Sequence, residues 1–63
     1  MNREQLLKYG IEVFNSETNK FSSWLLKSNF SLGGAVPNDL LDSEEGLKQV
    51  KKCLDRIEYG NFC

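Results

Sequence analysis

The side chains of this sequence that could perform chemistry are mainly carboxylates, which occur in the pairs Asp39/Asp42 and Glu44/Glu45. The chain contains no histidine. It therefore lacks the usual general base near neutral pH, and with it the cysteine–histidine and serine–histidine nucleophile arrangements. Both acidic pairs stand where a helix is predicted to begin, and carboxylates are favoured there for structural reasons alone. We therefore predict that the protein is not an enzyme and has no catalytic residue.

No cofactor or metal site is predicted either. The adjacent glycines Gly33 and Gly34 are not followed by the rest of a phosphate-binding loop. The only two cysteines are Cys53 and Cys63, and two cysteines without a histidine do not make a usual zinc site. Cys53 falls within an apolar helical pattern and Cys63 is the last residue. We interpret both as free thiols of a cytoplasmic protein, in preference to a disulfide.

Charge and length argue against several other classes of protein. Eight basic and nine acidic residues give a net charge of −1, and the basic residues are spread along the chain. This pattern favours solvated helix surfaces over a nucleic-acid-binding patch. No apolar run approaches the ~20 residues of a membrane-spanning helix, and no signal peptide is apparent at the start. What remains is a protein that works through its surface.

The elements that form this surface are predicted to be helical. Residues 2–15 carry an apolar stripe at helical spacing, interrupted by Gly10, where either another helix approaches closely or the helix bends. A second helix follows, with Asn15 or Ser16 as its cap. Its aromatic stripe leads us to predict that Trp24 is the centre of the core.

A structured connection links this helix to the last one. We expect Phe30 and Leu32 to plug the core from an irregular segment. Gly33 and Gly34 allow either a positive φ or a close backbone contact. Pro37 suits the first turn of a short helix, because its missing amide would be unpaired there anyway.

The last helix has the clearest pattern, with apolar residues at a 3-4-3 spacing: Leu47, Val50, Leu54 and Ile57. Asp42 or Ser43 is its predicted cap, and Asp42 with Glu45 fits an acidic capping box. Gly60 stands where a glycine ends a helix. Gly46 indicates that something packs on the backbone, and we assign this contact to the Gly-Gly bend. The predicted fold is all-α: one domain, residues 1–63, of about four helices with a Gly-Gly bend and a long C-terminal helix.

The connection and last helix resemble the toxin-binding domain of Xre/MbcA/ParS-type antitoxins. The ordered pattern is matched by Trp24, Leu25, Asn29, Leu32, Gly33, Gly34, Pro37, Leu40, Leu41, Gly46, Val50, Leu54, Ile57 and Gly60. The resemblance covers about residues 9–62. The upstream segment departs from it at Asn15, where glycine is common in the family.

The resemblance implies a bacterial type II antitoxin, or its toxin-binding half. The usual partner of this family is a RES-domain toxin that consumes NAD, and the antitoxin blocks the toxin by direct contact. Many relatives also carry an N-terminal helix-turn-helix domain, whereas this chain starts at Met1 just before the toxin-binding region. We therefore expect no DNA-binding domain and no direct binding of nucleic acid. Whether the chain is a natural short form or an excised domain stays open at this point.

We place the partner-binding surface at the end of the last helix and the tail. Arginine and tyrosine are enriched among binding hot spots, and the tail has no periodic place in the core. The predicted contact residues are Arg56, Tyr59, Gly60, Asn61 and Phe62. The mechanism implied by the resemblance is steric occlusion of the toxin's NAD pocket. A frayed terminus is the alternative interpretation of the tail.

A different function is also compatible with the sequence. The chain could be a self-associating helical module, or a regulator without a toxin partner. Phe30, Phe62 or Tyr9 could then form the patch of a homodimer.

Overall fold

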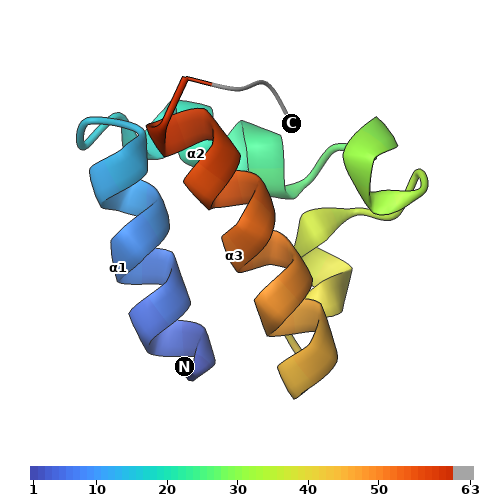
Figure 1. Cartoon of the computed structure of the whole chain (residues 1–63). Helices are drawn as coiled ribbons and strands as arrows, with labels where there is room; N and C mark the ends of the chain where they lie inside the picture. Colours follow the sequence, from blue (N-terminus) through green and yellow to red (C-terminus); the bar gives the residue numbers. More distant parts are fainter. Residues whose placement is uncertain (61–63) are drawn as a thin grey trace.

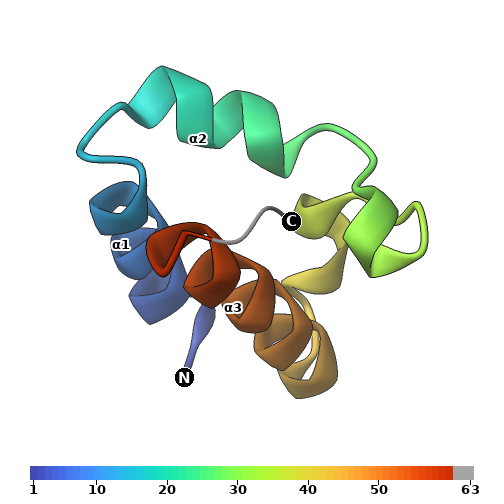
Figure 2. The ribbon, with the colours of Figure 1, turned by 45° about the horizontal axis from the view of Figure 1, so that its top comes forward.

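The computed structural model describes residues 1–60, which form α1 (Arg3–Val13), α2 (Thr18–Leu25), the 3-10 helices η1 (Phe30–Leu32) and η2 (Pro37–Leu40), and α3 (Glu44–Glu58). α1 and α3 lie side by side, and α2 crosses near one end of this pair (Figure 1, Figure 2). η1 and η2 pack on α3, on the side away from α1. The all-α prediction is confirmed, including the short turn that begins at the proline and the long closing helix.

The first two helices begin in different ways. α1 has a capping box, in which Asn2 Oδ1 accepts the backbone N–H of Gln5 at 2.8 Å and Gln5 Oε1 accepts the N–H of Asn2 at 3.0 Å. The N-cap of α2 is Glu17, without a side-chain hydrogen bond. The predicted caps are wrong, because Asn15 and Ser16 have positive φ of 55° and 65°, whereas an N-cap residue is usually extended.

α3 is capped by one of its two predicted candidates. Ser43 has an extended backbone, and its Oγ accepts the backbone N–H of Gly46 at 3.0 Å. The predicted box of Asp42 and Glu45 is therefore wrong, since Asp42 lies one residue outside the cap. Its carboxylate instead lies 3.7 Å from the guanidinium of Arg3, and this ion pair connects the starts of α1 and α3.

The core lies where the three α-helices meet the end of η2. Its fully or nearly fully buried apolar residues are Leu6, Val13, Phe21, Leu25, Leu41, Leu47, Val50 and Leu54. Trp24 is not the centre of this core, because it is only partly buried. Its ring lies 5.9 Å from that of Phe14 and 6.2 Å from that of Phe21. The reason is that α2 packs mainly on α1 and η2, so a large side chain on α2 reaches only the edge of the core.

The prediction that Phe30 plugs the core is also wrong. Phe30 is 98% exposed, whereas Leu32 is partly buried against the core. A 3-10 helix has three residues per turn, so side chains two residues apart point in different directions. Only one of the two can face inward, and that one is Leu32.

Buried glycines mark two places where another element packs directly on a helix backbone. The ring of Phe21 lies over Gly10, so α2 approaches α1 closely there. At Gly46, an added Cβ would overlap the carbonyl oxygen of Leu40, the last residue of η2. Of the two alternatives for Gly10, the close approach is therefore the one observed.

The Gly-Gly bend is not the partner of Gly46, contrary to the prediction. Gly33 and Gly34 have φ of +69° and +86°, and nothing lies within 4 Å of where a Cβ would stand. These glycines are required by their backbone conformation. Close packing plays no part, because the bend is open to solvent.

Cys53 lies on the buried face of α3 with 3% exposure, and its sulfur is disulfide-bonded. The predicted free thiol at Cys53 is therefore wrong. The helical spacing of the sequence correctly places Cys53 on the buried face of α3. It cannot show whether the sulfur of Cys53 forms a disulfide. The prediction for Cys63 falls outside the described residues.

Candidate protein-binding surface

Three of the predicted partner-binding residues gather at the C-terminal end of α3. Arg56 is exposed in the last turn, and Tyr59, the C-cap, is 79% exposed. Gly60 follows and is also exposed. Asn61 and Phe62, the other two predicted residues, lie outside the described residues. One helix end therefore presents a cation and an aromatic ring to solvent.

The backbone explains why the helix ends here. The N–H of Tyr59 donates to the carbonyl of Asp55 at 3.0 Å, and the N–H of Gly60 donates to the carbonyl of Ile57 at 3.2 Å. Gly60 has a φ of +90°, which favours glycine and turns the chain off the helix axis. The predicted helix-ending glycine is thus confirmed. Arg56 in the last turn also suits the negative end of the helix dipole.

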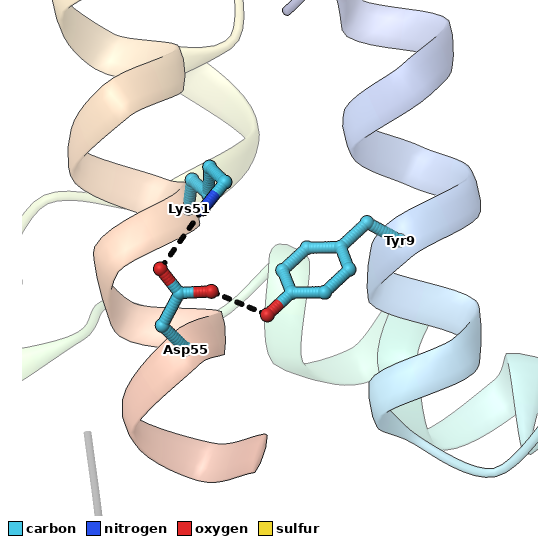
Figure 3. Close-up of polar contacts among 3 residues, drawn as sticks. All are labelled: Tyr9, Lys51 and Asp55. Carbon is cyan, nitrogen blue, oxygen red and sulfur yellow. Dashed lines mark hydrogen bonds and ion pairs between the residues drawn. The ribbon is translucent and has the colours of Figure 1, made fainter. Parts of the chain in front are cut away.

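A polar cluster joins α1 to α3 close to this end (Figure 3). The Tyr9 hydroxyl donates a hydrogen bond to the Asp55 carboxylate. The Lys51 ammonium donates to the other carboxylate oxygen at 3.0 Å, and it also lies 5.6 Å from the centre of the Tyr9 ring.

The charges in this cluster are fixed by its hydrogen bonds. The bond to Asp55, together with partial burial, raises the pKa of the Tyr9 hydroxyl far above its usual value. The same bond lowers the pKa of Asp55, and Lys51 acts in the same direction. At neutral pH the hydroxyl stays protonated and the carboxylate stays ionised. The cluster is a structural link that holds α3 against α1.

A shallow hollow of about 190 Å³ lies between η1 and α3, away from the side of α3 that carries the polar cluster with Tyr9. Its lining residues are Ser31, Leu32, Gln49, Lys52 and Arg56. Arg56 therefore connects the helix end with the region of the bend. Lys52 was not among the predicted site residues. Its spacing of four from Arg56 is the sequence signal that could have found it, because residues four apart share one face of a helix.

The loop that borders this hollow is held in shape by Asn29, which is only 7% exposed. Its N–H donates to the carbonyl of Ala35, and its carbonyl accepts from the N–H of Gly34, both at 2.9 Å. Its side-chain Oδ1 accepts the N–H of Ser31 at 2.9 Å. Residues 29–35 thus form a closed, hydrogen-bonded turn. In the sequence, Asn29 stood out only as one of the residues that match the family pattern.

Residues 1–60 contain neither a metal-binding cluster nor a membrane-spanning helix. No group of three or more histidine, cysteine, aspartate or glutamate side chains in this range could hold a metal ion. None of the helices in this range is both long and apolar enough to cross a membrane.

Comparison with known proteins gives two matches that agree with each other. The family described as antitoxin Xre/MbcA/ParS C-terminal toxin-binding domain matches residues 10–60. The chain is also similar to a protein of Photorhabdus laumondii subsp. laumondii described as antitoxin Xre, with 29% identity over 56 residues. The match covers 89% of this chain but only 38% of that relative, so the chain spans well under half of the relative's length. No solved structure matches the chain.

Proposed function

Because the chain belongs to the Xre/MbcA/ParS antitoxin family through that family's C-terminal toxin-binding domain, we propose that it is an antitoxin of a bacterial type II toxin–antitoxin system. On this proposal it acts by binding a toxin protein. The observation that carries the proposal is the family match over residues 10–60, which contains α2, η1, η2 and α3 in full.

The toxin proposed is a RES-domain enzyme that consumes NAD, as the family resemblance implies. The contact residues proposed are Arg56, Tyr59, Gly60, Asn61 and Phe62, and the bound antitoxin covers the mouth of the toxin's NAD pocket. Support comes from the exposed arginine and the 79% exposed tyrosine at the end of α3, since both residue types are common binding hot spots. Inhibition of this kind needs no chemistry from the antitoxin itself.

The proposed location is the cytoplasm, where such a toxin meets NAD. Free thiols no longer support this location, since Cys53 is disulfide-bonded. The proposal for the location therefore depends on the family alone.

The test uses the full chain and the purified product of the gene next to its own. NAD is measured in a mixture of the two proteins. The parent chain is expected to preserve NAD, whereas the double variant Arg56→Ala, Tyr59→Ala is expected to bind about tenfold or more weakly and to let NAD fall. The matched control is Lys20→Ala with Leu26→Ala, which changes an exposed cation on α2 and the exposed apolar residue at the C-cap of α2.

Each outcome of this test decides one part of the proposal. A neighbouring protein that does not bind the parent chain would refute the antitoxin function. A neighbour that binds but never consumes NAD would refute the RES-type toxin. Full protection by the Arg56/Tyr59 double variant would move the interface to another surface.

Self-association without a toxin is the second candidate function. The exposed side chains Leu26, at 67%, and Phe30, at 98%, favour it, because exposed apolar side chains can form an interface. Sedimentation of the chain alone at high concentration distinguishes the two functions. A stable dimer that ignores the neighbouring protein would support self-association. A DNA-binding regulator would instead shift its own promoter fragment in a gel.

A further inference from the structure

Phe30 is the most exposed of the large apolar side chains in the described range, at 98%. A single exposed apolar residue is normal on a protein surface, but this one sits on a turn of fixed shape. Hydrogen bonds join the buried Asn29 at the start of this turn to Gly34 and Ala35 at its end. A ring displayed by a rigid turn loses little backbone freedom on binding, which lowers the cost of an interface.

Next to Phe30, the turn continues into the hollow on α3. Ser31 and Leu32 form one wall of this hollow, and Lys52 and Arg56 contribute two cations to it. Within the part of the chain that the structure describes, neither cation lies within 4 Å of a carboxylate.

These cations differ from their neighbour Lys51, which is paired with Asp55 at 3.0 Å. Like charges four residues apart on a helix repel each other, so the interaction between Lys52 and Arg56 does not itself stabilise α3. A carboxylate brought by a partner would relieve this repulsion. Arginine can hold a carboxylate through two parallel hydrogen bonds.

We infer that Phe30, Ser31, Leu32, Lys52 and Arg56, together called the Phe30 surface, dock a segment of the toxin that pairs an acidic side chain with an apolar pocket. The carboxylate binds between Lys52 and Arg56, and the pocket receives the ring of Phe30. This inference rests on the proposed function. Arg56 belongs both to the proposed contact residues at the end of α3 and to the Phe30 surface. The proposed interface therefore extends from the end of α3 onto the turn.

A protein partner is favoured over a nucleic acid by charge. The chain carries a net charge of −1, and the Phe30 surface offers two cations in place of the extended basic stripe of a phosphate-binding protein. Aromatic residues and arginine are also both enriched at protein–protein interfaces and among their hot spots.

The test changes residues that the proposed α3-end contacts do not include. The purified product of the neighbouring gene is titrated with the full chain carrying Phe30→Ala or Lys52→Glu. Each change is expected to raise Kd about tenfold or more. Lys8→Glu on α1 is the matched control for charge, because α1 lies on the far side of α3 from the turn (Figure 1). It alters net charge equally and should change Kd by less than about threefold at moderate salt.

Two further variants separate contact from folding. Phe30→Leu keeps an apolar side chain and should retain most of the affinity that Phe30→Ala loses. Lys52→Gln removes the charge without reversing it and should weaken binding in the same direction as Lys52→Glu. Melting temperatures close to that of the parent would establish that all four variants fold.

The results decide the inference in either direction. If the parent binds the neighbouring protein and both Phe30→Ala and Lys52→Glu bind equally well, the Phe30 surface is not the interface, while the antitoxin function stands. If the parent does not bind at all, both proposals fail. Two other results would overturn the inference. If the chain forms a dimer that Phe30→Ala dissociates, the Phe30 surface binds a second copy of the chain. If the chain forms a DNA complex that Lys52→Glu dissociates, the surface binds DNA.

Discussion

The junction of η2 with α3 and the turn of residues 29–35 both depend on glycine, but the surroundings of these glycines differ completely. At the junction, Gly46 is buried and the carbonyl oxygen of Leu40 occupies the place of a Cβ. In the turn, Gly33 and Gly34 are exposed, have positive φ, and have nothing within 4 Å of a Cβ. The junction is constrained by its neighbours and the turn by its own backbone. A turn that holds its shape without being covered leaves its surface free for a partner.

The largest effect is expected at the junction. Gly46→Ala should lower the free energy of unfolding by about 3 kcal/mol, because a backbone carbonyl has no rotamer with which to move aside. This loss would exceed the gain of ~1 kcal/mol that alanine brings to a helix. Urea denaturation at neutral pH measures it. Gln49→Ala, an exposed change on the same helix, should stay within about 0.5 kcal/mol.

A Gly46→Ala variant as stable as the parent would break the comparison. It would mean that η2 can shift away from α3 at little cost. Both regions would then tolerate added volume equally well.

The turn should show a smaller effect with a different chemical signature. Gly33→Ala should cost about 1 kcal/mol, because an L-residue with a side chain is strained in the left-handed region. Gly33→Asn should cost less, since asparagine tolerates this conformation. The two melting curves measure the difference. Equal losses for alanine and asparagine would indicate a packing constraint, as at the junction.

The sequence predicted the elements well because periodicity and capping residues act locally. Leu54 and Val50 fell on the buried stripe, and Gly60 at the helix end, as predicted. The contacts between elements were harder to predict. Gly46 was correctly interpreted as a close-contact position, but nothing local could say that its partner is Leu40.

The candidate site was predictable only in part, for a related reason. Trp24 and Phe30 are both aromatic, and hydrophobicity alone assigned both to the core. Their actual positions depend on where α2 and η1 sit relative to α3, which is set by tertiary packing. The exposure of Arg56 and Tyr59 could be predicted because helical phase and the glycine that ends the helix are visible in the sequence. Lys52 becomes a candidate only through the hollow beside η1, which depends on how η1 packs on α3.

The link between α1 and α3 gives a pH-dependent test away from both glycine regions. Tyr9→Phe should cost about 1 kcal/mol at neutral pH, since it removes a hydrogen bond to a charged group at a partly exposed position. The lowered pKa of Asp55 means that the unfolded chain binds the proton more readily. The parent therefore loses stability as pH falls below the unfolded value of about 4.

Tyr9→Phe should flatten this acid dependence. Urea midpoints measured at about pH 7 and about pH 3.5 would show it as a smaller difference than in the parent. The raised pKa of Tyr9 has the opposite effect on the pH dependence. The stability that the Tyr9 hydrogen bond contributes is fully present below about pH 10 and is lost as the pH rises above that value. Tyr59→Phe, at a 79% exposed tyrosine, is the control for the acid side and should leave the difference between about pH 7 and about pH 3.5 as it is in the parent.

The smallest effect on stability is expected on the turn itself. Phe30→Ala should change the free energy of unfolding by less than about 0.5 kcal/mol, because a side chain that is 98% exposed buries almost no apolar area on folding. Phe21→Ala is the contrasting variant. Its ring is 3% exposed and covers Gly10, so its loss should cost about 3 kcal/mol or more. Calorimetric melting of the two variants measures the contrast. A loss above about 1 kcal/mol for Phe30→Ala would show that the ring is packed in solution, and the turn would then resemble the junction in contributing to stability.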